Sequence, residues 1–215
     1  MGYLPSLSTC LKYGSTLFLS GFFLTAGLLY TYQCALIYPS SFPAGSRSDV
    51  ATPDEYDLPY EALELHTPDG ETLRAYMIPR EEQGRPTVLF LHANAGNMGH
   101  RLPLAQVFYK KYACNIFMLS YRGYGLSTGV PNEKGIRIDA QTALDWLLND
   151  ARTKATRIVA YGQSIGGAVA VDLASRNGKS VSGARRESGE SVCSKWRGKI
   201  ARGKGNAGHA RAGPS

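Results

Sequence analysis

Residues 157–176 read RIVAYGQSIGGAVAVDLASR, and the interpretation of the whole chain starts from this stretch. Residues 158–161 are apolar and partly β-branched, which favours a strand, whereas residues 168–174 favour a helix. Residues 162–166, Gly-Gln-Ser-Ile-Gly, therefore lie where a strand turns into a helix, and they match the G-x-S-x-G pattern of a nucleophile elbow. The alternative is a glycine-rich turn that carries an incidental serine.

The elbow pattern predicts a role for each of its residues. A serine on such a turn takes a strained backbone conformation, and its hydroxyl is lifted out of the sheet. Gly162 and Gly166 would lack side chains because the strand and the helix must approach closely there. Ser164 is then the predicted nucleophile. The backbone N–H of Ile165, at the start of the helix, would point toward developing negative charge and form part of an oxyanion hole.

The net charge of +7 is confined to the end of the chain. Residues 1–177 contain 15 basic and 15 acidic residues, whereas residues 178–215 contain 9 and 2. The domain thus has no electrostatic reason to bind nucleic acid. A tail that binds nucleic acid or anionic lipid is a further alternative, although glycine and serine dilute its charges. The four scattered cysteines form no C-x-x-C pattern and have no histidine at metal spacing, so we expect neither metal nor cofactor.

Near the N-terminus, residues 15–37 contain no charged side chain. A helix of that length reaches about 34 Å, enough to cross a hydrocarbon core of about 30 Å. We therefore predict one transmembrane anchor over residues 13–38, after a short segment of residues 1–12. A cleaved signal peptide is the alternative, but its apolar region would be shorter. The flanking charges favour a cytoplasmic N-terminus for this single-pass membrane protein.

The anchor is followed by a proline-rich segment, residues 39–60, that is predicted to be a linker leading away from the membrane. Residues 61–66 and 72–78 alternate apolar and polar side chains around Pro68-Asp69-Gly70, which predicts a β-hairpin.

Residues 87–92 form a continuous apolar run, which is typical of a parallel strand buried on both faces. The small-residue loop after this strand is where a second oxyanion N–H would come from. Asn94 is the first candidate for that N–H, and Ala93 is the alternate. His92 is expected to be a structural residue rather than a catalytic base.

A further buried strand is predicted at residues 115–120 and an amphipathic helix at residues 131–149. Strands and helices then alternate through the elbow. This order predicts an α/β fold, with a β-hairpin followed by a predominantly parallel sheet that has helices on both faces.

The stretches LHANAGNMGHR, SYRGYGLSTG and GQSIGGAVAVDLASRN, in this order after a hairpin, resemble the membrane-anchored α/β-hydrolases of the Bem-forty-six type. The resemblance covers residues 13–177 and implies that Ser164 is a nucleophile, with Ile165 and Asn94 as the oxyanion hole. It also implies hydrolysis of acyl esters or thioesters, similar to palmitoyl-protein hydrolases, with an acylated protein as a candidate substrate. The His-Gly that is usual in this family is His92-Ala93 here, so the backbone at that position is less free.

The pattern of the fold is predicted to end at Asn177. Residues 61–177 would be the N-terminal half of an α/β-hydrolase domain, and residues 178–215 a basic, Gly/Ser-rich disordered tail. Gly178-Lys179-Ser180 is compatible with codons that contain a splice-donor consensus, so we predict that the tail is translated intron. The nucleotide sequence at these codons tests this prediction.

A catalytic triad in this fold runs Ser, acid, His along the chain, yet the only histidine after Ser164 is His209, in the tail. The prediction is therefore a membrane-anchored serine hydrolase that is inactive or severely impaired as this chain. The alternatives are a non-catalytic membrane fragment or adapter, and a serine peptidase-like α/β-hydrolase.

Overall fold

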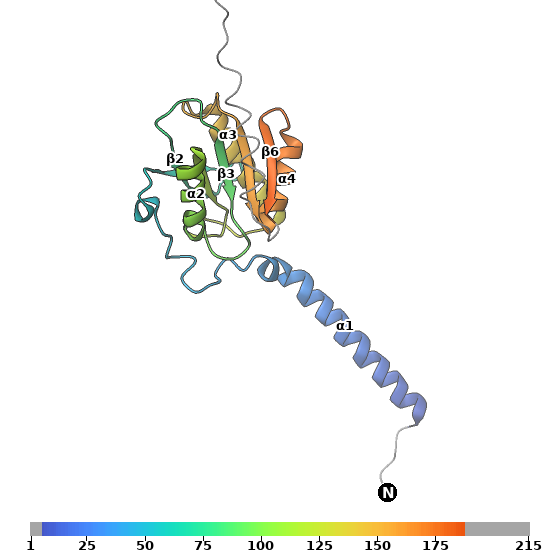
Figure 1. The fold of residues 1–215 in the computed structure, drawn as a ribbon. Helices are drawn as coiled ribbons and strands as arrows, with labels where there is room; N and C mark the ends of the chain where they lie inside the picture. Colours follow the sequence, from blue (N-terminus) through green and yellow to red (C-terminus); the bar gives the residue numbers. More distant parts are fainter. Residues whose placement is uncertain (1–5, 188–215) are drawn as a thin grey trace, which may run out of the picture.

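The computed structural model describes residues 6–187, which form one long N-terminal helix and an α/β domain (Figure 1). Helix α1 spans Leu7–Ile37 and begins at Ser6, whose Oγ accepts a hydrogen bond from the N–H of Thr9. None of its residues is buried against the domain, and it projects away from the rest of the molecule. By length and composition α1 could cross a membrane. It begins before the uncharged run of residues 15–37 because Ser6 supplies an N-terminal cap.

The domain contains a single six-stranded sheet in the order β1-β2-β4-β3-β5-β6. Strands β1 (Glu61–His66) and β2 (Thr72–Ile78) form the predicted antiparallel hairpin, and β2 pairs antiparallel with β4 (Asn115–Ser120). Strand β3 (Thr87–Leu91) lies between β4 and β5 (Ile158–Gln163) and is parallel to both. The α/β architecture with a hairpin and a mainly parallel sheet is thus confirmed.

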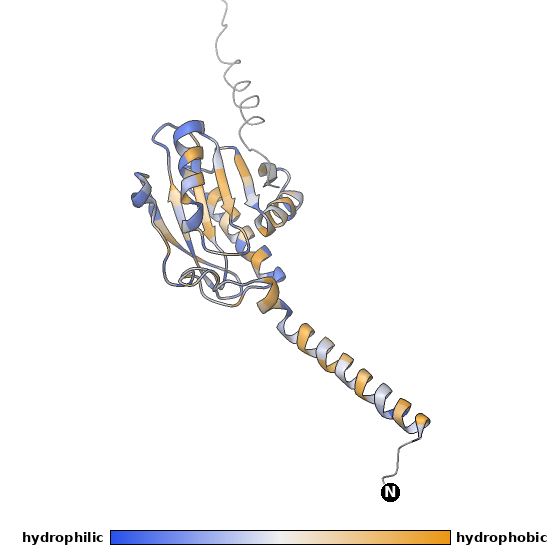
Figure 2. Ribbon diagram, turned by 60° about the horizontal axis from the view of Figure 1, so that its bottom comes forward, coloured by the Kyte–Doolittle hydropathy of each residue, from blue (hydrophilic) through white to orange (hydrophobic). Residues whose placement is uncertain are grey.

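Helices cover both faces of this sheet. On one face, α2 (Leu102–Tyr112), preceded by the short helix η2 (Gly99–Arg101), packs against alternate residues of β3 and β4. On the other face, α3 (Glu133–Asn149) and α4 (Ile165–Arg176) cover the remaining residues of these strands. The inner strands of the sheet are largely orange in Figure 2, as expected for strands that are buried on both sides, whereas the edge strand β1 is mostly exposed.

The sixth strand corrects the prediction that the sheet pattern ends at Asn177. Strand β6 (Val181–Glu187) pairs in parallel with β5, so the ordered domain extends into the segment that was predicted to be disordered and β5 has no free edge. This segment has few large apolar side chains, which is why it was predicted to be disordered. An edge strand, however, needs mainly backbone hydrogen bonds to one neighbour. Val181 is 4% exposed and joins the core. The remaining tail, including His209, lies outside the described residues.

The segment between α1 and β1, which was predicted to be a linker, is instead part of the domain. It folds back over the domain and contains a short helix, η1 (Pro53–Tyr56), and a buried residue, Leu58. The Asn97 Nδ2 donates to the carbonyl oxygens of Ser46 and Asp49, at 3.0 and 2.9 Å. We call residues 38–51 the strap. The proline pattern showed that no long helix forms here, but it could not show that the segment is held by distant side chains.

Candidate active site

Ser164 lies between β5 and α4, at the turn that the G-x-S-x-G pattern predicts. Its backbone has φ 51° and ψ −119°, a conformation that non-glycine residues rarely adopt and that is retained only when the surrounding fold imposes it. The side chain is exposed, and its hydroxyl makes no capping hydrogen bond to the helix that follows. The Ser164 hydroxyl is therefore presented to solvent at the carboxyl edge of the sheet.

The two glycines of the elbow are required by backbone contacts. A β-carbon on Gly162 would lie 2.0 Å from the carbonyl oxygen of Gly166. A β-carbon on Gly166 would lie 2.1 Å from the carbonyl oxygen of Leu91, at the end of β3, and 2.6 Å from that of His92. These are contacts with backbone atoms, so side-chain rotation cannot relieve them. The start of α4 consequently presses directly against β3 and β5, which forces the strained turn at Ser164.

The candidate oxyanion residues lie at the same edge of the sheet. Leu91 pairs with Gly162 across the parallel strands, so the loop that carries Ala93 and Asn94 follows β3 beside the elbow. Ile165 is the first residue of α4, where a helix N–H has no intrahelical partner. Within the described residues, no backbone group accepts a hydrogen bond from the N–H of Ile165, Ala93 or Asn94. This arrangement can supply donors to a negatively charged oxygen.

The Asn94 side chain has contacts that the sequence did not suggest. Its Nδ2 donates to the carbonyl oxygen of Ile37, the last residue of α1. Its Oδ1 accepts from the hydroxyl of Tyr124 at 3.0 Å. Asn94 thus connects the N-terminal helix to the loop after β3 and to the loop after β4. The only sequence signal for Tyr124 was its place in the glycine-rich run 121–127, which has no distinctive pattern for such a contact.

His92 is built into the domain below this loop. Its ring lies 4.4 Å from the Tyr121 ring and 4.9 Å from the Tyr124 ring, centroid to centroid. The Nδ1 atom is 2.8 Å from the carbonyl oxygen of Ala93, and Nε2 accepts from the N–H of Tyr121 at 3.4 Å. Burial lowers the pKa of His92 to about 4, because the charged ring would be removed from water. These contacts support a structural role.

The other two histidines of the described region also have partners. His66 Nδ1 lies 3.3 Å from Thr72 Oγ1, and His100 Nδ1 accepts from the N–H of Asn97 at 3.0 Å. Within residues 6–187, no group of three or more His, Cys, Asp or Glu side chains is arranged to hold a metal ion.

A buried ion pair supports the loop after β4. Arg122 contacts Asp139 on α3 and Asp69 in the hairpin turn, each at 2.8 Å, and its side chain is 6% exposed. Asp139 is completely buried, and burial raises its pKa despite hydrogen bonds from Arg122. The Asp69 pKa is lowered by hydrogen bonds from Arg122 and Thr67. This network positions the loop and does not belong to the elbow.

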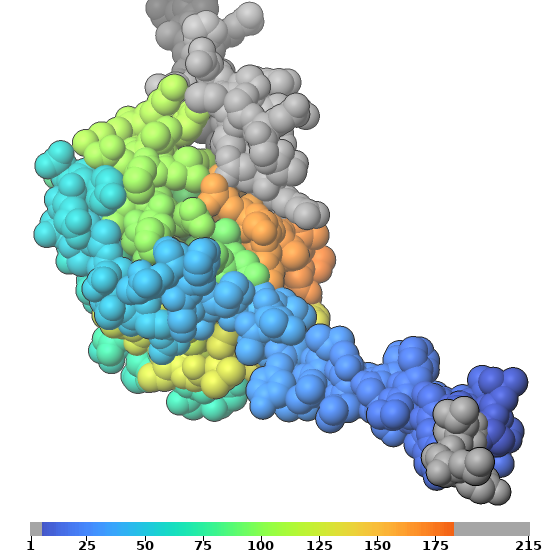
Figure 3. All heavy atoms as spheres, turned by 90° about the horizontal axis from the view of Figure 1, so that it is seen from below, coloured from blue at the N-terminus to red at the C-terminus, as the bar shows by residue number. Residues whose placement is uncertain are grey.

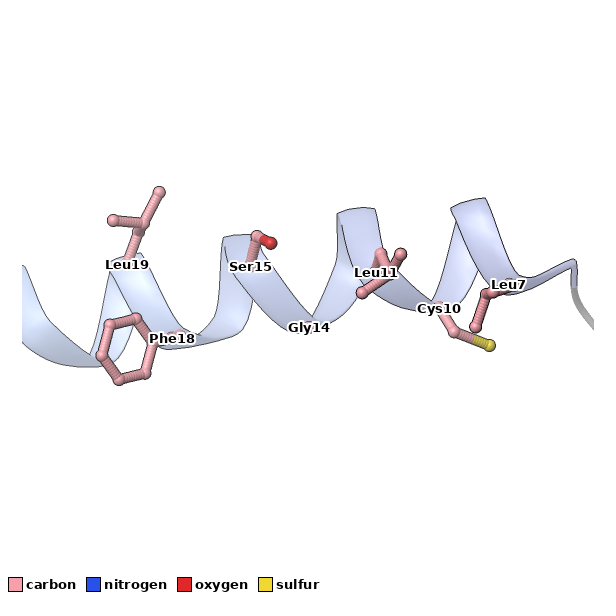
Figure 4. Close-up of a pocket in the computed structure, with 7 residues that line it drawn as sticks. All are labelled: Leu7, Cys10, Leu11, Gly14, Ser15, Phe18 and Leu19. Atoms are coloured by element: carbon pink, nitrogen blue, oxygen red, sulfur yellow. The ribbon is translucent and has the colours of Figure 1, made fainter.

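Two surface hollows are away from Ser164. The larger is lined only by residues of α1, which Figure 4 shows along one side of the helix: Leu7, Cys10, Leu11, Gly14, Ser15, Phe18 and Leu19. The smaller lies mainly along α3. The larger hollow lies on the side of a single helix and does not enclose a ligand, so its position and its lining do not indicate a binding site.

The fold and the elbow define the class of the protein. Residues 86–185 match the family model described as alpha/beta hydrolase fold. Together with the sheet order and the Ser164 turn, this match shows that the chain has the α/β-hydrolase fold.

Two relatives show which group of α/β-hydrolases this chain is similar to. Protein bem46 of Schizosaccharomyces pombe is 51% identical over 174 residues, which cover 80% of this chain and 58% of that protein. Uncharacterized membrane protein YNL320W of Saccharomyces cerevisiae is 41% identical over 153 residues, which cover 71% of this chain and 53% of that protein. The chain is therefore a homologue of the Bem46-type α/β-hydrolases, and it spans just over half the length of these relatives.

Among solved structures, the esterase Pf2001 of Pyrococcus furiosus aligns with a TM-score of 0.54 and 24% identity. The alignment covers 62% of this chain and 52% of that one. At this level of identity the likeness concerns the fold.

Proposed function

We propose that this protein is a membrane-anchored serine hydrolase that cleaves acyl esters or thioesters, with Ser164 as the nucleophile. The observation that carries the proposal is the backbone of Ser164 at φ 51° and ψ −119°, which holds an exposed hydroxyl at the carboxyl edge of the sheet. The serine is preceded by a buried strand and followed by a helix N-terminus. This environment suits a nucleophile whose attack creates a negative charge.

In the proposed reaction, the Ser164 Oγ attacks the acyl carbonyl carbon and the carbonyl oxygen becomes negatively charged. The N–H groups of Ile165 and Asn94 donate to this oxygen, with Ala93 as the alternate donor. Collapse of this intermediate breaks the bond to the alcohol or thiol, which leaves with the proton that Ser164 gave up, and water then hydrolyses the acyl-enzyme to the carboxylic acid and returns a proton to the Ser164 Oγ. In this fold the acid and the histidine follow the nucleophile along the chain, so the base that activates Ser164 is not assigned among the described residues.

Membrane anchoring is part of the proposal. Helix α1 has no buried residue, and it is long and apolar enough to cross a bilayer once. The Saccharomyces cerevisiae relative YNL320W is named a membrane protein. We place the N-terminus on the cytoplasmic side from the flanking charges. The proposed substrate is an acyl ester or thioester, an acylated protein being one candidate.

Covalent labelling tests the nucleophile. The 215-residue chain, expressed in membranes, is treated with a fluorophosphonate probe. Because no base is assigned to Ser164 in this chain, we expect weak labelling of the wild type and of Ser175→Ala, which removes another exposed serine, on α4. Labelling should disappear in Ser164→Ala. Equal labelling of Ser164→Ala and the wild type would refute the role of Ser164.

Substrate turnover tests the reaction class. A p-nitrophenyl short-chain ester, an acyl-coenzyme A thioester and a chromogenic peptide are compared with wild type and Ser164→Ala. Because no base is assigned to Ser164, we expect slow ester or thioester hydrolysis by this chain, and we expect that turnover to fall to background in Ser164→Ala. Peptide hydrolysis without esterase activity would instead support the serine peptidase-like alternative.

One observation favours a non-catalytic adapter as the second candidate. Each of the three histidines in residues 6–187 already has a structural partner. A folded chain that shows neither labelling nor turnover above the Ser164→Ala control would support the adapter and reject the hydrolase for this chain.

A further inference from the structure

Helix α1 joins the domain without a flexible spacer. It ends at Ile37, whose carbonyl oxygen accepts a hydrogen bond from Asn94 Nδ2 in the loop after β3. The next residue, Tyr38, is partly buried and packs against the core of the domain. If α1 spans the bilayer, the domain therefore begins where the helix ends. The domain cannot stand away from the membrane on an extended tether.

The strap covers the same end of the domain. The N–H of Gly96 donates to the carbonyl oxygen of Phe42 at 2.8 Å, which attaches the strap to the loop after β3. Arg47 donates to the carbonyl oxygens of Gly123 and Ser127, which attaches it to the loop after β4. Figure 3 looks onto this end and shows the strap in lighter blue beside the end of α1 that joins the domain.

Exposed apolar side chains gather on these segments. Outside α1, five large apolar side chains of the described region are substantially exposed. The three most exposed are Val130 at 71%, Phe42 at 67% and Leu126 at 56%, all of which lie on the strap or on the loop after β4. The other two, Val171 and Val107, lie on helices α4 and α2. Scattered apolar residues need no explanation, but a cluster beside a candidate span does.

We propose that the end of the domain formed by the strap and the loop after β4 rests on the bilayer, with Phe42, Leu126 and Val130 in contact with lipid. The inference rests on the proposed anchoring by α1, because the rigid junction carries this end of the domain to the membrane surface. Ser164 lies at the same carboxyl edge of the sheet, since β5 is parallel to and paired with β3. The nucleophile is then close to acyl chains that remain partly in the bilayer.

Tryptophan fluorescence in vesicles tests this contact. The full chain is reconstituted in phosphatidylcholine vesicles whose acyl chains carry bromine, which quenches tryptophan on contact. The bromine is near the headgroup for the surface variants and near the chain ends for the variant in the middle of α1. Phe42→Trp and Val130→Trp are the test variants. Leu24→Trp, in the middle of α1, reports insertion of the helix. Val107→Trp and Glu82→Trp are exposed controls on α2 and in the β2–β3 loop, and the parent signal of Trp146 and Trp196 is subtracted.

We expect the added tryptophan of Phe42→Trp and Val130→Trp to be quenched roughly twofold more than those of Val107→Trp and Glu82→Trp, because aromatic side chains at the interface contact lipid. Quenching of Leu24→Trp together with equal quenching of test and control variants would overturn the inference and leave the anchor intact. No quenching of Leu24→Trp would overturn both. If Phe42→Trp or Val130→Trp loses its cooperative melt, Leu126→Trp replaces it.

Discussion

Among single residues, the two glycines of the elbow occupy positions where the surrounding backbone leaves no room for a side chain. Gly162 and Gly166 have backbone carbonyl oxygens at the positions that a β-carbon would need. The strained conformation of Ser164 follows from this close approach, since β5 and α4 leave the turn between them no other path. The two glycines thus permit the backbone geometry that positions the Ser164 hydroxyl. Substitution of either glycine should therefore lower the free energy of unfolding.

Gly162→Ala should lower the free energy of unfolding by about 3 kcal/mol or more, because its β-carbon would lie 2.0 Å from a backbone oxygen and no side chain can move away. Chemical denaturation in detergent micelles measures the change. Gly178→Ala is the matched control, since its β-carbon would meet only an ordinary contact at 3.7 Å, and we expect a change within about 0.5 kcal/mol. Similar stabilities of the two variants would contradict the steric explanation.

His92 should make the domain sensitive to mild acid. Its pKa is lowered to about 4 in the folded protein by burial, against about 6.5 in an unfolded chain. The unfolded state therefore binds more protons between these values, so stability is complete above pH 6.5 and falls as the pH drops toward 4. The loss should be about 1 kcal/mol at pH 5.5 relative to pH 7.5.

Denaturation curves at pH 7.5, 6.5 and 5.5 measure this effect of His92. The control is His92→Gln, which keeps a polar side chain of similar size but cannot titrate. We expect its stability to change little over this range. If wild type and His92→Gln lose stability equally between pH 7.5 and 5.5, another group is responsible.

At the scale of elements, the Arg122 network joins three parts of the fold: the loop after β4, helix α3 and the hairpin turn. Arg122 Nη2 and Nε both contact Asp139 Oδ1, at 2.8 and 2.9 Å, and the backbone N–H of Arg122 donates to Asp139 Oδ2 at 2.8 Å. A buried ion pair contributes little net stability, but loss of one partner leaves an uncompensated charge. The network therefore fixes the arrangement of these elements.

Arg122→Met should cost about 3–5 kcal/mol near neutral pH, because Asp139 is then buried without its cation. Removal of Arg122 should raise the already raised pKa of Asp139 further. A raised pKa in the folded state means that stability is present at low pH and is lost as the pH rises. The destabilisation of Arg122→Met relative to the wild type should thus be larger at pH 7.5 than at pH 5.

The double variant Arg122→Met, Asp139→Asn tests whether Asp139 causes this pH dependence. It removes the buried charge, so its stability should recover in part, and its difference from the wild type should be nearly the same at pH 5 and pH 7.5. If the destabilisation of the single variant relative to the wild type does not grow as the pH rises, Asp139 is not the titrating group. Thermal melts across this pH range distinguish these outcomes.

At the scale of the whole molecule, α1 and the domain meet at a junction with few degrees of freedom. Asn94 links the Ile37 carbonyl oxygen to Tyr124, and Tyr38 packs on the core of the domain. The direction of α1 relative to the sheet is then set by side-chain contacts. For an enzyme at a membrane, such a junction would determine which edge of the domain the bilayer meets.

Asn94→Ala should loosen this junction. With spin labels introduced through unnatural amino acids at Leu24 and Glu82, the wild type should show a narrow distance distribution by electron paramagnetic resonance. Asn94→Ala should broaden it, because the hydrogen bonds to Ile37 and Tyr124 are lost. Asn149→Ala, which removes a bond at the far end of α3, is the control and should leave the distribution narrow. Equal widths in all three proteins would show that Asn94 does not hold the junction.

Features that are specified by residues close together in the chain could be predicted from the sequence alone. The hairpin, the buried strands, the long apolar helix and the elbow at Ser164 follow from alternation, apolar runs and the spacing of glycines, because each feature is specified within a short stretch. The sequence also predicts that Asn94 and Ile165 lie at one edge of the sheet, since loops after parallel strands meet there, and their role as oxyanion donors stays a prediction.

Contacts between segments that lie far apart in the sequence could be found only in the tertiary structure. The strap is held by Asn97, which lies 48 and 51 residues beyond its hydrogen-bond partners Asp49 and Ser46. Strand β6 forms because β5 offers an open backbone edge, although the composition of its segment favours disorder. Asn94 reaches the end of α1 across 57 residues. Such contacts depend on the shape of the folded surface, which no local pattern encodes, and they set the position of Ser164 relative to helix α1.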